Sequence, residues 1–287
     1  MPTTWRATTT PGTQFKIDLG TSALLLEGVT SLTPFPGTRP TSEWTPINAQ
    51  GKKYKSGRPA YGKASGEVAV DPTDPSFLRL LALYNLAPLS CLTDVEVALV
   101  DSGSKAFKWT AFCDEFGISF ANEGVLKAKF GFQAVTGATA MVTPTVVVPS
   151  STFDPVVCQG ASLGFYVGAA YVTLAGVSNI ELQGGARDSS PATPIDALAA
   201  SSLPGYRGQT KLLFDLLFDS TEVNHMAMFT SFNALTPVTD KFKINFAGGA
   251  HNIPLADCNI DAFALPTAPG VNIVKVAATV NVDIAIA

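Results

Sequence analysis

The sequence is short of the residues on which most catalytic and metal sites depend. Its 287 residues include only two histidines, His225 and His251, and no HxxxH or HExxH spacing occurs. Its four cysteines, Cys91, Cys113, Cys158 and Cys258, form no CxxC pair, and we expect free, buried thiols in a reducing cytoplasm rather than a disulfide. The sequence therefore predicts a protein that is not an enzyme and that needs no metal or cofactor.

Three further features of the sequence offer little chemistry. Asp114 and Glu115 are adjacent carboxylates, but neighbours on a strand point to opposite faces, so we do not expect an acid/base pair. His225 lies among apolar helical residues and is expected to be structural, while His251 follows Gly248-Gly249 and is expected in a turn. No glycine-rich phosphate-binding loop is present.

Charge is also scarce. Asp, Glu, Lys and Arg make up 15% of the chain, against about 25% in an ordinary soluble domain. Hydrophobic residues reach 46%, which excludes a disordered chain. The net charge of −4 argues against nucleic-acid binding driven by charge. Scarce charge indicates either a membrane protein or a protein that assembles.

One uncharged stretch, Val156 to Ile180, is long enough to span a bilayer. Within it, however, Leu163, Phe165 and Val167 alternate with Gly164 and Gly168, which is a strand pattern. Residues 1–14 are polar and do not resemble a signal peptide. We therefore expect no membrane span.

The chain contains an internal repeat, which supports this choice. At an offset of 148 residues, Leu26-Glu27-Gly28-Val29-Thr30 falls on Leu174-Ala175-Gly176-Val177-Ser178. Asp71 falls on Asp219 and Asn85 on Asn233, while Lys129 falls on Lys275 at an offset of 146. The uncharged stretch thus corresponds to residues 8–32, which carry charged residues at strand spacing and cannot form a membrane helix. Scarce charge therefore indicates assembly.

The repeat predicts two tandem domains, residues 1–143 and 158–287. Residues 144–157 contain Pro144, Pro149 and Pro155 and are expected to form a stiff, extended linker. The expected fold is mainly β with one helix per domain, each domain a β-sandwich or open barrel. The expected elements, in order, are a strand pair (14–33; 162–183), a polar loop (34–60; 184–206), a strand (64–70; 210–218), a helix (74–86; 221–233) and three strands (93–100, 106–120, 124–136; 238–246, 252–265, 270–286).

The first polar loop holds the one concentrated charge. Lys52, Lys53, Lys55, Arg58 and Lys63 lie within twelve positions, with Tyr54 and Tyr61 between them. Residues 1–148 have a net charge of +1 and residues 149–287 a net charge of −5. A solvated loop or a DNA-binding patch would also be basic, but this asymmetry favours head-to-tail assembly of a basic loop onto an acidic neighbour.

The order of elements resembles the tail tube protein of long-tailed bacteriophages. The resemblance is carried by L-x-G-V-[TS], by Ser65-Gly66-Glu67-Val68-Ala69-Val70 leading into a helix, by Phe107-Lys108-Trp109-Thr110-Ala111-Phe112-Cys113, and by Gly124-Val125 through Gly131-Phe132. It implies a structural virion subunit of a sheathless, flexible tail, assembled in the host cytoplasm. Rings of such subunits stack into a β-lined channel for DNA ejection.

The resemblance also implies partners and an interface. A duplicated chain would form trimeric rings with pseudo-sixfold symmetry, in contact with tape-measure, tail-tip and terminator proteins, with the genome passing through without sequence-specific binding. The long loop would bridge successive rings. Its expected interface residues are Trp44, Lys52, Lys53, Tyr54, Lys55 and Arg58.

Two other functions remain open at this point. Another virion β-sandwich, such as a tail-tip, decoration or adhesin protein, would share the fold but would not polymerise. A hydrolase on a β scaffold would need a nucleophile and base, and the sequence offers no such pair.

Overall fold

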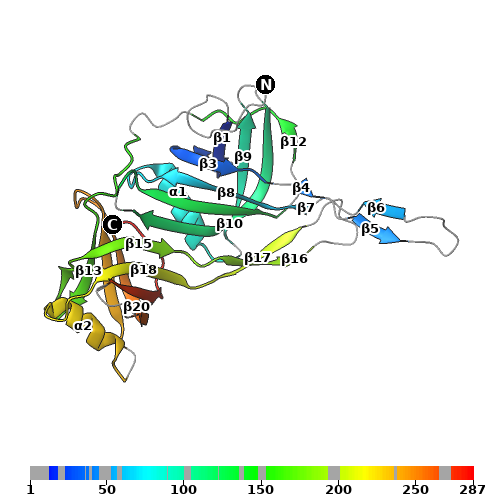
Figure 1. Ribbon diagram of the computed structural model, residues 1–287. Coiled ribbons are helices and arrows are strands. Elements are labelled where there is room, and N and C mark those ends of the chain that lie inside the picture. The colour runs from blue at the N-terminus through cyan, green and yellow to red at the C-terminus, as the bar shows by residue number, and fades with distance from the viewer. Residues whose placement is uncertain are drawn as a thin grey trace.

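A computed structural model describes most of the chain (Figure 1). The described residues are 13–18, 23–35, 37–38, 41–44, 53–56, 60–88, 90–99, 105–121, 123–135, 139–147, 153–192, 201–235, 238–264 and 273–287. They form antiparallel β-sheet with two helices, α1 (Pro75–Asn85) and α2 (Val223–Phe232). The prediction of a mainly β fold with one helix in each half is confirmed.

Seven strands of the first half follow one another in space in the order β2-β1-β9-β10-β11-β8-β3. An eighth strand, β12, pairs with the start of β10. Their bounds are β1 (Thr13–Ile17), β2 (Leu24–Leu25), β3 (Val29–Thr33), β8 (Lys63–Ala69), β9 (Leu92–Leu99), β10 (Lys105–Phe120), β11 (Lys127–Ala134) and β12 (Thr139–Val142).

Seven strands of the second half have the same arrangement, in the order β14-β13-β19-β20-β21-β18-β15. Their bounds are β13 (Ser162–Val167), β14 (Ala170–Thr173), β15 (Val177–Gln183), β18 (Thr210–Leu217), β19 (Asp240–Asn245), β20 (Asn252–Ala264) and β21 (Ile273–Val280). The six pairings β1·β2, β1·β9, β9·β10, β10·β11, β8·β11 and β3·β8 correspond to β13·β14, β13·β19, β19·β20, β20·β21, β18·β21 and β15·β18.

The correspondence extends to single residues. Lys129 lies opposite Glu67 in the first half, and Lys275 lies opposite Asp215 in the second. A β-bulge interrupts β10 between Cys113 and Glu115, and another interrupts β20 between Ile260 and Ala262. Because a bulge shifts the register by one residue, its recurrence at matching points requires the same strand curvature in both halves.

Each helix begins at an acidic cap. Asp74 accepts a hydrogen bond from the Phe77 amide, with Pro75 as the first helical residue. Glu222 caps α2 by accepting from the amides of Asn224 and His225. Asp71 and Asp219, which the sequence placed at the helix starts, close the preceding turns by accepting from the amides of Thr73 and Thr221.

The two predicted polar loops contain β-hairpins that the sequence did not predict. The first contains two small hairpins, β4 (Gly37–Thr38) with β7 (Ala60–Tyr61) and β5 (Thr41–Trp44) with β6 (Lys53–Ser56). The second contains the hairpin of β16 (Arg187–Pro191) and β17 (Ser202–Arg207). The sequences of these strands lack the regular apolar–polar alternation that identifies a half-buried strand.

The long uncharged stretch forms strands, as its alternation predicts. Leu163 and Phe165 of β13 are buried, and β13 pairs with β14 and β19. No helix among the described residues is long and apolar enough to cross a membrane.

The described parts of the predicted linker are held against the first half. The Thr145 amide and hydroxyl donate to Glu96, which also accepts from Lys16 at 2.9 Å. Glu96 and Lys16 are buried. Farther along, the Val156 amide donates to the Val70 carbonyl, and the Val156 carbonyl accepts from the Leu126 amide. The connection between the halves is therefore bonded to the fold on both sides of residues 148–152, which lie outside the described residues.

We expect Glu96→Gln to lower the free energy of unfolding by about 3–5 kcal/mol, because it leaves the Lys16 ammonium buried without its counter-charge. Burial alone would raise the pKa of Glu96, but hydrogen bonds from Lys16 and Thr145 outweigh it and hold the pKa below its ordinary value. The carboxylate therefore stabilises the fold above the ordinary Glu pKa, and this stability is lost as pH falls through the lowered folded-state value.

Urea unfolding at several pH values measures this difference. The exposed Glu123→Gln is the matched control and should leave the midpoint unchanged. Equal midpoints for both variants at neutral pH would contradict the assignment.

Candidate assembly surfaces

A strand pairing joins the two halves into one sheet. The end of β10 pairs with β15 of the second half, with Gly117 opposite Gln183 and Phe120 opposite Ile180. The pairing lies on the edge of β10 that β9 occupies earlier along the strand. This half-to-half joint therefore connects two structurally corresponding units through different parts. The first half contributes its last long β-hairpin, and the second half contributes its third strand.

Arg187 completes the joint. Its guanidinium donates to the carbonyls of Tyr84 (3.0 Å) and Leu86 (2.7 Å) at the C-terminal end of α1. It also donates to the carbonyls of Cys113 (3.4 Å) and Gly205 (3.0 Å), and the residue is 6% exposed. Because helix α1 has no basic residue in its last turn, Arg187 supplies the positive charge that the negative end of the helix favours.

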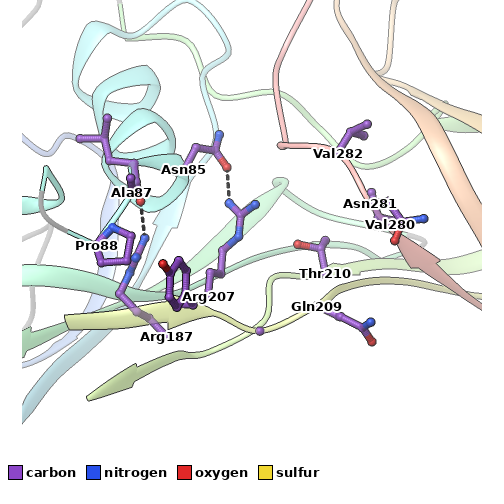
Figure 2. A pocket seen from close by; sticks show the side chains of 13 residues that line it. Asn85, Ala87, Pro88, Arg187, Arg207, Gln209, Thr210, Val280, Asn281 and Val282 are labelled. Carbon is purple, nitrogen blue, oxygen red and sulfur yellow. Dashed lines mark hydrogen bonds between the residues drawn. The ribbon is translucent and has the colours of Figure 1, made fainter. Parts of the chain in front are cut away.

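A cavity of about 370 Å³ lies beside this contact (Figure 2). Arg207 extends into it, donates to the Asn85 side chain at 2.6 Å and to Asp283 at 2.6 Å, and stacks over the Tyr84 ring. The Asn85 amide in turn donates to the Ile284 carbonyl. These polar groups hold α1, β17 and the C-terminal segment together.

The ends of the two helices differ in what covers them. The helices as a whole differ in burial. Six residues of α1 are buried, Ser76, Phe77, Leu80, Leu81, Leu83 and Tyr84, whereas only His225 and Met228 of α2 are buried. At the C-terminal end of α2, Asn233 and Ala234 are exposed and Leu235 is fully exposed. The second half covers the end of α1, and no described part of the chain covers the end of α2 in the same way.

The predicted inter-ring residues fall on the β5–β6 hairpin. In its register Trp44 lies opposite Lys53 and Glu43 opposite Tyr54. Tyr54 is 65% exposed and Lys55 is exposed. The hairpin extends far from the rest of the described structure (Figure 1). Lys52 and Arg58 lie outside the described residues.

His225 and the four cysteines have structural surroundings. His225 is buried, with Nδ1 accepting from the Asp219 amide and Nε2 contacting the Ala175 carbonyl at 3.0 Å, and it stacks on Phe218. All four cysteines are free and buried. Throughout the described ranges, no group of three or more His, Cys, Asp and Glu side chains could hold a metal ion.

The expectation that the Asp114 and Glu115 side chains point to opposite faces was wrong. Both carboxylates contact the Lys63 ammonium, Asp114 at 3.2 Å and Glu115 through a close hydrogen bond. The bulge at Asp114 breaks the alternation, so adjacent side chains reach the same cation. Burial raises the pKa of Asp114, against the opposing effect of Lys63.

Arg187 is not among the residues predicted from the sequence, although the repeat contains a signal for it. Extending the 148-residue offset beyond Val29 and Val177 places Gly37-Thr38-Arg39 on Gly185-Ala186-Arg187. An arginine at the same point of both repeats indicates a shared role. The signal was missed because a single arginine in a polar loop is ordinarily solvated.

No protein-family model matches the chain, and no curated protein matches its sequence.

We expect Arg187→Met to lower the free energy of unfolding by at least about 3 kcal/mol, since it leaves several buried carbonyls without a donor. Calorimetry should show the loss at neutral pH. Lys211→Met, which removes an exposed cation from β18, is the control and should change little. Matching stabilities of the two variants would show that Arg187 does not hold the joint.

The native thiols should be inert. Burial raises the pKa of Cys258 to about 12 and raises that of Cys113 even further, so almost no thiolate forms near neutral pH. We expect less than one thiol per chain to react with a disulfide reagent at pH 8, and all four to react in denaturant. Rapid labelling of Cys113 or Cys258 in the folded protein would contradict this.

Proposed function

We propose that the chain is the structural subunit of a bacteriophage tail tube, built from two copies of one domain and assembling as stacked rings. The rings would be trimers with pseudo-sixfold symmetry, and the tube would conduct the genome during ejection. Tape-measure, tail-tip and terminator proteins would be its virion partners, and the virion tail its location.

The observation that carries this proposal is the half-to-half joint. It joins corresponding units head to tail, through parts that differ between the two partners, and such a contact can be repeated from one chain to the next. Within the described residues β3 pairs only with β8, whereas its counterpart β15 pairs with both β18 and β10. Among the described residues, one edge of β3 therefore has no strand partner, and this is the edge that would make the pairing of β15.

The corresponding acceptor on the second half begins at Ala264 of β20, the position that matches Gly117 of β10. Residues 265–267, which match the rest of the pairing, lie outside the described residues. If β3 of one chain pairs with this segment of another, every joint around the ring has the same form. The ring of chains then closes without any other type of contact.

The β5–β6 hairpin supports stacking. An exposed hairpin that carries lysine and an aromatic residue well away from the fold suits contact with another subunit. The second half, with a net charge of −5 over residues 149–287, offers a complementary surface. In this arrangement Trp44, Lys52, Lys53, Tyr54, Lys55 and Arg58 form the contact between rings.

Negative-stain electron microscopy of the concentrated, purified chain tests the proposal. Tubes or stacked rings with a central hole, with three strong and three weak lobes in end view, are the expected result. A chain that stays monomeric, alone and with a tail-tip complex, would favour another virion β-sandwich such as a decoration or adhesin protein.

Removing the β5–β6 hairpin should separate ring formation from stacking. We expect a variant with residues 41–56 replaced by a short Gly-Ser linker, and the double variant Lys53→Glu/Lys55→Glu, to form rings that do not lengthen into tubes. Lys105→Glu/Lys211→Glu, which makes the same charge change at two exposed positions on β10 and β18, is the control and should form tubes. Tubes of normal length from the hairpin variants would remove the hairpin from the stacking contact.

A further inference from the structure

The C-terminal end of α2 lacks the contact that its counterpart has. At the end of α1, Arg187 of the second half binds the carbonyls of Tyr84 and Leu86. The 148-residue offset relates these two residues to Phe232 and Ala234 at the end of α2. Phe232 is half-buried and Ala234 is exposed, and α2 has no basic residue in its last turn. The negative end of α2 therefore has no arginine of this kind in the described part of the chain.

The same offset identifies an arginine for it. Arg39 corresponds to Arg187, within the matched segments Gly37-Thr38-Arg39 and Gly185-Ala186-Arg187. Arg187 follows β15, which pairs with the half that carries α1. Arg39 lies outside the described residues and follows β3 in the sequence, and within the described residues β3 pairs only with β8 of its own half. The strand pairing that brings Arg187 to α1 therefore has no equivalent between β3 and the second half in the described part of the chain.

We propose that the C-terminal end of α2 is a docking surface for a second copy of this chain, whose Arg39 binds the carbonyls of Phe232 and Ala234. The inference rests on the proposed function, because it takes the joint between the two halves of one chain to form between neighbouring chains as well. In this arrangement the C-terminal carbonyls of α1 and of α2 each accept hydrogen bonds from the arginine of the next half along the ring. Leu235, fully exposed in the single chain, lies beside this contact.

Two features of the internal joint do not carry over. Tyr84 donates its hydroxyl to the Gly185 carbonyl at 3.0 Å, and its counterpart Phe232 has no hydroxyl. The Gly184 amide donates to the Phe116 carbonyl at 2.8 Å, and the counterpart of Gly184 is Pro36, which has no amide hydrogen. The contact between chains therefore has fewer hydrogen bonds, and Arg39 supplies a larger share of them.

A cross-linking experiment tests the contact directly. One preparation carries Arg39→Cys, a second carries Ala234→Cys, and the two are mixed and treated with a short bismaleimide. The four native cysteines are buried and should not react. We expect covalent dimers from the mixture and none from either preparation alone. A mixture of Lys105→Cys and Ala234→Cys is the control and should give none.

A second variant measures the contribution of the guanidinium. Arg39→Met should raise the chain concentration needed for ring formation by roughly tenfold or more, the effect of losing charged hydrogen bonds. Its unfolding midpoint as a monomer should not change, because the proposed partner belongs to another chain. Lys105→Met is the control for assembly.

The outcomes separate this inference from the proposed function. Rings and tubes that form normally with Arg39→Met, without cross-linked dimers, would overturn the docking surface and leave the tube subunit standing. Cross-linked dimers from the mixed Cys variants, together with a wild-type chain that never forms rings, would support the contact and overturn the tube. Absence of both would overturn both.

Discussion

The organisation of this molecule depends on one buried guanidinium. Arg187 is almost fully enclosed, and its counter-charge is the negative end of a helix together with four backbone carbonyls rather than a carboxylate. Enclosing a cation in this way is favourable only when every donor has a well-placed acceptor. The position of β16 is therefore fixed relative to α1. The pairing of β10 with β15 and the contacts of Arg207 follow from that fixed geometry.

Much of the fold could be predicted from the sequence because its strongest signals are local. The alternation of Leu126, Ala128, Phe130 and Phe132 identifies β11, all four residues being buried. The acidic residues with Pro75 and Thr221 place the two helix starts to within two residues. These signals need no knowledge of tertiary contacts, since they arise from the period of the element and from its caps.

The remainder depended on contacts that a local pattern does not show. The bulge at Asp114 brings two adjacent carboxylates to Lys63, and nothing in Asp114-Glu115 distinguishes a bulge from a regular strand. In the described part of the chain, the strand pairings of β5–β6 and of β16–β17 lie within each hairpin, and the sequences of these strands lack the alternation that would reveal them. Of the predicted interface residues, four lie in β5 and β6, but their proposed role depends on a second molecule. Arg187 could have been found from the repeat alone, by following the aligned glycines to the arginines two residues later.

The unequal loops of the two halves have a consequence for symmetry. In the proposed ring of three chains, the far-reaching β5–β6 hairpin would occur at alternate positions only, because β16 and β17 correspond to β4 and β7 and the described residues of the second half contain no counterpart of β5 and β6. A ring that looks sixfold in its sheets would then be strictly threefold in its contacts with the next ring. Each added ring could settle in three equivalent rotational positions instead of six. The twist from ring to ring would accordingly be set by the first half of each chain, while the second half could vary without altering it.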